Sequence, residues 1–169
     1  MTRKYRYLLA VVLTLGLAST AMAAGSSSSS KRPSAQPPST YEQGVKAVKA
    51  GNYNRAIPLL QQVVARNPNH ADALNYLAFS HRQLGQNEIS LDLYKKVLAM
   101  NPDHKGANEY LGELYLKQGK LDLAKKQLAR LDDICTFGCT EFDDLKAAVK
   151  TFEAGGGFKG FSKQSQSAK

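Results

Sequence analysis

The sequence predicts an all-α fold in which helical hairpins stack on one another, because it repeats with a period of 34 residues. The same kind of stop occurs twice on this period, at Asn67-Pro68-Asn69-His70 and at Asn101-Pro102-Asp103-His104. Each stop follows a stretch of helical character, and its proline prevents the helix from continuing. Such a period is typical of helix-turn-helix units that bury their apolar faces against the next unit.

Glycines and small residues on the same period place the features of each hairpin. The glycines are Gly51, Gly85 and Gly119. Glycine takes a positive φ at little cost directly after a helix, so each should lie where the first helix of a hairpin ends. The small residues are Ala56, Ser90 and Ala124. They predict the point where the second helix crosses close to the first.

These residues together resemble the tetratricopeptide repeat family, whose signature places large apolar, Gly/Ala, Tyr and Pro residues at fixed positions. The matching residues of the first repeat are Gly44, Gly51, Tyr53, Ala56, Leu60 and Pro68. Those of the second are Leu74, Leu77, Ala78, Gly85, Tyr94 and Pro102, and those of the third are Leu111, Gly112, Tyr115, Gly119, Ala124 and Leu128. The resemblance implies a right-handed superhelical stack of three repeats within residues 40–135, at about 37–70, 71–104 and 105–135.

A further amphipathic helix is predicted over residues 140–154, where it would cover the apolar end of the stack. Its apolar residues recur at helical spacing: Phe142, Leu145, Val149 and Phe152. Thr140, together with Asp143, is expected to cap the start of this helix.

Cys135 and Cys139 lie between the third repeat and the capping helix. In an oxidising compartment, two thiols this close in sequence most often form a disulfide. On an unbroken helix their Cβ atoms would lie about 6 Å apart, too far for a bridge, so the bond requires the break that Gly138 supplies. We therefore predict a disulfide that fixes the capping helix against the third repeat. A thiol-based copper or redox carrier is the alternative.

The sequence predicts no metal site, no cofactor and no catalytic residues. Zinc prefers four ligands, whereas only two thiols are present, and His70, His81 and His104 fit turn and helix positions of the repeats. We find no Ser-His-Asp ordering, no His-Glu-x-x-His motif and no glycine loop for phosphate. We expect a protein that is not an enzyme.

Residues 1–23 are predicted to be an export signal. Basic residues precede an apolar run from Leu8 to Ala18, and Ala21-Met22-Ala23 forms a small-x-small cleavage site. The run is shorter than the roughly 20 residues that span a bilayer, so no stable membrane span is expected after cleavage, although a retained signal is the alternative. These features predict an exported protein of the periplasm or cell envelope.

Two polar segments flank the predicted stack. Residues 24–39 form a Ser/Pro-rich linker and residues 155–169 a tail with three lysines, Phe158 and Phe161; both are predicted to be disordered. A Phe-Lys-Gly-Phe docking motif is the alternative for the tail. The net charge is +9, and +6 without the signal, which favours an acidic partner. No helix face carries the basic stripe that nucleic-acid binding requires.

The resemblance implies a partner-binding surface on the concave face of the stack, which we call the aromatic face. Its nine residues are Tyr41, Asn75, Tyr76, Phe79, Arg82, Glu109, Tyr110, Glu113 and Lys117. Tyrosines with mixed charges beside them suit a protein or peptide partner, although some of the rings could instead pack between helices. A receptor for a C-terminal carboxylate is not expected, since Tyr41, Val45, Tyr76, Gly106 and Tyr110 occupy the family's clamp positions. Self-association through an end of the stack is a further expectation.

Overall fold

The computed structural model describes residues 38–157, and within them the chain is entirely helical, with no strand. The helices are α1 (Thr40–Lys49), α2 (Tyr53–Arg66), α3 (Ala71–Gln83), α4 (Asn87–Met100), α5 (Lys105–Lys117), α6 (Leu121–Ile134) and α7 (Thr140–Thr151), followed by a π-helical turn, η1 (Phe152–Gly156). The predicted signal at 1–23, nearly all of the linker and the tail from Phe158 onward lie outside the described residues.

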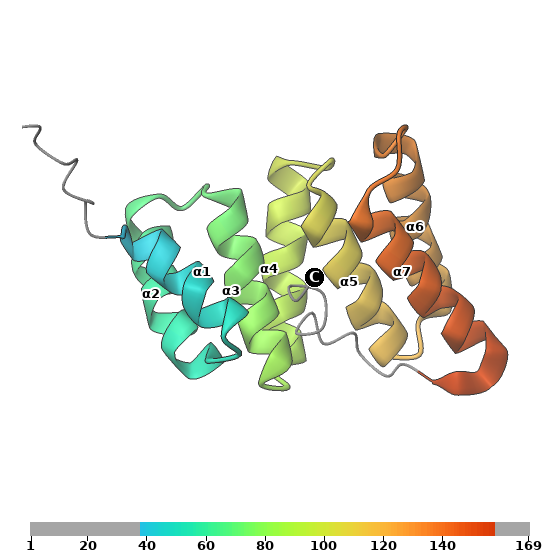
Figure 1. The fold of residues 1–169 in the computed structure, drawn as a ribbon, viewed down its shortest axis with the longest axis horizontal. Coiled ribbons are helices and arrows are strands. Elements are labelled where there is room, and N and C mark those ends of the chain that lie inside the picture. Colours follow the sequence, from blue (N-terminus) through green and yellow to red (C-terminus); the bar gives the residue numbers. More distant parts are fainter. Residues whose placement is uncertain (1–37, 158–169) are drawn as a thin grey trace, which may run out of the picture. The chain divides into compact units, whose positions relative to one another are not determined.

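The seven helices form three hairpins and a final single helix (Figure 1). Within the hairpins, α1 contacts α2, α3 contacts α4 and α5 contacts α6. The first helices of successive hairpins also contact one another, and α7 packs on both α5 and α6. Since α7 takes the place of the first helix of a fourth hairpin, it covers the end of the stack. This arrangement confirms the predicted fold class.

The turn inside each hairpin follows the predicted pattern. Gly51, Gly85 and Gly119 have φ values of 71°, 79° and 72°. The three small residues are fully buried where the two helices of a hairpin meet. In the second hairpin, the hydroxyl of Ser90 donates a 2.8 Å hydrogen bond to the carbonyl of Ala78, which ties α4 to α3. Both predictions from the period are therefore confirmed.

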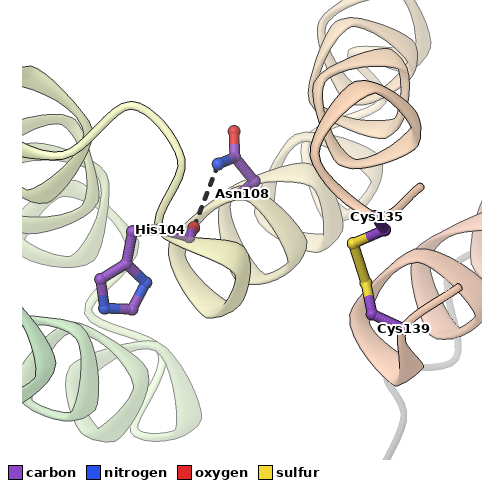
Figure 2. Close-up of a disulfide and its surroundings, with 4 residues drawn as sticks. All are labelled: His104, Asn108, Cys135 and Cys139. Atoms are coloured by element: carbon purple, nitrogen blue, oxygen red, sulfur yellow. Dashed lines mark hydrogen bonds between the residues drawn. A yellow bond between two sulfur atoms is a disulfide. The ribbon is translucent and has the colours of Figure 1, made fainter. Parts of the chain in front are cut away.

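The two inter-repeat stops each end in a histidine that caps the next helix. The Nδ1 atom of His70 accepts from the N–H of Ala73 at 3.3 Å, and that of His104 accepts from the N–H of Ala107 at 3.1 Å. Figure 2 shows how the second stop is closed further, because the side-chain amide of Asn108 donates to the carbonyl of His104 at 3.0 Å. These contacts explain both histidines as structural residues.

The start of α7 differs from the prediction. The helix is preceded by Cys139, whose extended backbone (φ −157°, ψ 152°) makes it the N-cap, and Thr140 is already the first helical residue. The carbonyl of Cys139 accepts from the N–H of Asp143, and no side chain caps the helix. The expected cap at Thr140 was wrong by one residue, because the non-helical backbone geometry of an N-cap lies at Cys139 and Thr140 is already helical.

Candidate functional site

The aromatic face brings together residues from the first helices of the three hairpins. Tyr41 comes from α1, four residues come from α3 and four come from α5. The rings of Tyr41 and Tyr76 lie 6.4 Å apart, centroid to centroid, and those of Phe79 and Tyr110 lie 4.8 Å apart. The aromatic residues that were grouped by their repeat positions are therefore neighbours across helices.

An ion pair lies at the centre of this face. The Nη1 atom of Arg82 on α3 is 2.6 Å from the Oε2 atom of Glu113 on α5, and the two side chains are only 5% and 2% exposed. The guanidinium also lies over two rings, 5.2 Å from the centroid of Phe79 and 5.4 Å from that of Tyr110. Burial favours the neutral form of Arg82 and would by itself lower the pKa of its guanidinium. The interactions with Tyr94 and Glu113 act in the opposite direction and are larger together, so the pKa of Arg82 is raised above its ordinary value.

Burial divides the nine residues into a core and an accessible part. Six of them are buried: Asn75, Phe79, Arg82, Glu109, Tyr110 and Glu113. Tyr41 and Tyr76 are half-buried, and Lys117 is exposed. For Phe79 and Tyr110, packing between helices, which the sequence left as an alternative, is what the structure shows. The binding role of the face remains a prediction.

Two further tyrosines, absent from the predicted set, extend the cluster from the second helices. The ring of Tyr53 lies 5.9 Å from that of Phe79, and the ring of Tyr94 lies 6.2 Å from that of Tyr110. Both residues match the family signature in the sequence, Tyr53 in the first repeat and Tyr94 in the second. Their contact with the face could not be predicted, because it depends on the angle between the helices of a hairpin.

Tyr94 provides a first testable prediction. Its side chain is fully buried, yet its hydroxyl has no hydrogen-bond partner within residues 38–157. A buried hydroxyl without a partner carries an uncompensated desolvation cost, so Tyr94→Phe should leave the free energy of unfolding unchanged or raise it by about 1 kcal/mol. Urea unfolding followed by circular dichroism measures the difference. A loss of more than about 1 kcal/mol would show that the hydroxyl is bonded in solution.

Tyr41 provides a prediction about alkaline pH. Burial, then the Asp72 carboxylate and then Tyr76, raise the pKa of Tyr41 from 10.0 to about 12. Between these two values the unfolded chain releases the phenolic proton while the folded chain keeps it, so stability falls as pH rises. Tyr41→Phe should remove the contribution of this group to the loss of stability at alkaline pH. Urea unfolding at a series of pH values from about 9 to 11 should give a flatter stability curve for the variant, and equal slopes would contradict the assignment.

Cys135 and Cys139 meet at the opposite end of the stack from α1. Figure 2 shows their sulfur atoms joined between α6 and α7, with the Cα atoms 5.6 Å apart. Helix α6 ends at Ile134, before Cys135, and Gly138, with φ 84°, lies in the turn between the two cysteines, so no unbroken helix joins them. Across residues 38–157, no group of three or more His, Cys, Asp or Glu side chains is placed to hold a metal ion. No described helix is long and apolar enough to cross a membrane.

Comparisons with known proteins agree with this arrangement. Two models of the tetratricopeptide repeat match the chain, one at residues 41–88 and the other at residues 90–149. Together they cover more than half of it. Among curated proteins, no significant match was found.

Solved structures with the same fold include three at low sequence identity. The first TPR domain of Spaghetti (RPAP3), bound to an HSP90 peptide, has a TM-score of 0.60 and 20% identity, covering 68% of this chain and 93% of that one. SycD of Yersinia enterocolitica, with a peptide of the translocator YopD, has a TM-score of 0.59 and 19% identity, covering 68% and 88%. A thermophilic TPR protein of Thermus thermophilus has a TM-score of 0.63 and 23% identity, covering 69% and 65%.

At these identities the likeness to solved structures shows the fold alone, whereas the two repeat models match the sequence itself. The matched residues include the turn glycines, the crossing residues and the histidine caps described above. The chain therefore belongs to the tetratricopeptide repeat family.

Proposed function

We propose that this protein is an exported, non-catalytic interaction scaffold of the periplasm or cell envelope, and that it binds a partner protein or peptide on the aromatic face. The observation that carries the proposal is that α1 and α3 place the half-buried rings of Tyr41 and Tyr76 6.4 Å apart, on the face that also holds the exposed Lys117 of α5. Accessible rings of this kind offer a large contact area at low entropic cost, and the buried Arg82–Glu113 pair beneath the face holds α3 and α5 together.

Two comparisons support a peptide as the partner. The similar structures of RPAP3 and SycD both hold peptides, one from HSP90 and one from a translocator. The export signal predicted at residues 1–23 supports the location. A non-catalytic role is supported by the family, whose members are generally interaction scaffolds.

The test uses the accessible part of the face, because Tyr110 is buried and its truncation would also weaken the core. A variant with Tyr76→Ala and Lys117→Glu should lose partners that the wild-type protein retains in a crosslinking pull-down from the native organism. The matched control changes two exposed residues of α4 and α6, with Ile89→Ala and Lys126→Glu. Circular dichroism should show equal helicity for all three proteins. Unchanged partner recovery by the face variant would overturn the proposal.

We also propose that Cys135 and Cys139 form a disulfide in the exported protein and serve as a structural clip. The pairing of the two sulfur atoms supports a clip rather than a copper or redox carrier, whose thiols must be free to bind or exchange. Intact-mass measurement after alkylation of the native exported protein should show no added label without reductant and two labels after reduction. Labelling of both thiols without reductant would favour the carrier.

A further inference from the structure

Charged residues at the helix ends divide between two opposite edges of the stack. Because successive helices run in opposite directions, the three hairpin turns lie along one edge and the connections between hairpins along the other (Figure 1). The first, which we call the turn edge, comprises residues 46–56, 80–90, 114–124 and 148–151. The second, the connection edge, comprises residues 40–43, 63–74, 97–108 and 131–143.

The two edges carry opposite charge. On the turn edge the exposed basic residues are Lys46, Lys49, Arg55, Lys117, Lys120 and Lys150, and the acidic ones are Glu88 and Asp122. On the connection edge the acidic residues are Glu42, Asp72, Asp103, Asp132, Asp133, Glu141 and Asp143, and the basic ones are Arg66 and Lys105. The stack as a whole is almost neutral, since eight of the 23 basic residues lie outside residues 38–157 and all 14 acidic ones lie inside. The edges of one chain are therefore complementary in charge to each other.

Helix dipoles explain only part of this division. An acidic residue is favoured at a helix N-terminus and a basic residue at a C-terminus. Asp132 and Asp133 nevertheless lie in the last turn of α6, whereas Arg55 and Lys120 lie at the starts of α2 and α6. All four are exposed, and none of their side chains makes an ion pair or hydrogen bond within residues 38–157. These charges oppose the local dipoles and are free to contact another molecule.

The exposed apolar side chains lie on the same two edges. Within residues 38–157, the large apolar residues that are exposed are Leu84, Ile89, Met100 and Phe137. Leu84 and Ile89 flank the second hairpin turn, whereas Met100 ends α4 on the connection edge and Phe137 lies between the two cysteines. The ring of Phe137 is fully exposed in a short loop that the disulfide closes, so its burial by a partner would cost little conformational entropy. Each edge thus offers apolar contacts beside its charges.

The edges are large enough for a specific interface. The helices α1, α3, α5 and α7 contact one another in order, and α2, α4 and α6 pack beside them. Since packed helices lie about 10 Å apart, each edge measures roughly 40 Å by 20 Å. The resulting area of about 800 Å² is what each partner contributes to a protein–protein interface of standard size.

We propose that the connection edge of one copy of this protein binds the turn edge of a second copy. In this contact the carboxylates of Asp132 and Asp133 face the lysines of the turn edge, and Phe137 packs on Leu84 and Ile89. Two different surfaces meet, so the second copy still offers its own connection edge and further copies can add in a row. A second copy uses both edges, whereas an anionic membrane would use the turn edge alone. The proposal does not depend on the partner-binding role of the aromatic face.

Sedimentation velocity of oxidised residues 24–169, from micromolar to submillimolar concentration, measures this association. At low salt the wild type should sediment faster as its concentration rises, and salt should weaken the effect by screening the charges. The connection-edge variant carries Asp132→Asn, Asp133→Asn and Phe137→Ser. The turn-edge variant carries Lys49→Gln, Leu84→Ser and Lys120→Gln. Each variant should keep the helicity of the wild type, because all six residues are exposed, and should associate at least about tenfold more weakly with itself.

Mixing the two variants tests whether the contact joins two different edges. The connection-edge variant keeps an intact turn edge, and the turn-edge variant keeps an intact connection edge. An equimolar mixture should therefore form a dimer that adds no further copy, although each variant alone is monomeric. Lys95→Gln with Lys96→Gln is the matched control, because these exposed residues lie in the middle of α4, away from both edges, and this protein should associate as the wild type does.

Other results would overturn the inference. A wild type that stays monomeric at every concentration would show that the edges do not bind each other. Association that both variants retain would place the contact elsewhere, such as at the α1 end of the stack. A mixture that stays monomeric, although the wild type associates, would exclude a contact between two different edges. Cosedimentation of a monomeric wild type with phosphatidylglycerol vesicles, lost in the turn-edge variant, would assign the turn edge to an anionic membrane instead.

Discussion

Replacing Arg82 with methionine should lower the free energy of unfolding by about 3–5 kcal/mol, one of the two largest effects expected in this protein. The guanidinium is nearly fully buried against the Glu113 carboxylate at 2.6 Å, and it also covers the rings of Phe79 and Tyr110. Removal of the cation leaves a carboxylate in a site from which water is largely excluded, and burying an unbalanced charge costs several kcal/mol. Urea unfolding of both proteins measures the difference.

Two further variants test whether the effect of Arg82→Met comes from the buried ion pair. Lys117→Met also removes a cation, here from α5, but Lys117 is exposed and donates only a 3.3 Å hydrogen bond to Asn87, so its effect should stay within about 0.5 kcal/mol. Changing Glu113 to leucine in the Arg82→Met background should restore much of the lost stability, because both charges are then absent. If Arg82→Met cost no more than Lys117→Met, the ion pair would not be buried in solution.

The repeat register explains why so much of the fold was predictable from the sequence. The turn glycines satisfy a local backbone requirement, and the small crossing residues recur at a fixed place in every hairpin, so both can be predicted from residue type and spacing. Gly85 has to be glycine because of its positive φ, whatever its neighbours are. The one-residue error at Thr140 arose because α7 begins without a side-chain cap, so no residue type marks its first position.

The sequence predicted which helices carry the residues of the candidate site, but not how deeply their side chains are buried. Repeat positions correctly brought Arg82 and Glu113 to one face, although the two residues are far apart in sequence. They did not reveal that the two side chains would be buried against each other, since this depends on the distance between α3 and α5 and on the rings that cover them.

The second large effect concerns the contact that holds the capping helix to the stack. Leu145 of α7 is fully buried, and its side chain fills the space above Gly112 of α5, where a β-carbon would lie only 2.5 Å from the nearest Leu145 atom. Leu145→Ala should therefore lower the free energy of unfolding by about 2–5 kcal/mol, as expected for a buried leucine that leaves a cavity. Phe137→Ala, at a fully exposed position of the nearby loop, is the control and should have little effect.

Substitution of Gly112 in the wild type and in the Leu145→Ala protein tests the same contact by a double-mutant cycle. In the wild type, Gly112→Ala should cost about 1–3 kcal/mol, because the new methyl group overlaps the leucine side chain and pushes α7 outward. In the Leu145→Ala protein the same methyl group enters the vacated space, and alanine also favours the helix by about 1 kcal/mol over glycine. The sign of the Gly112→Ala effect should therefore reverse between the two backgrounds. Additive effects in urea unfolding would show that α7 does not pack on α5 through this pair, and the stack would then need another way to cover its apolar end.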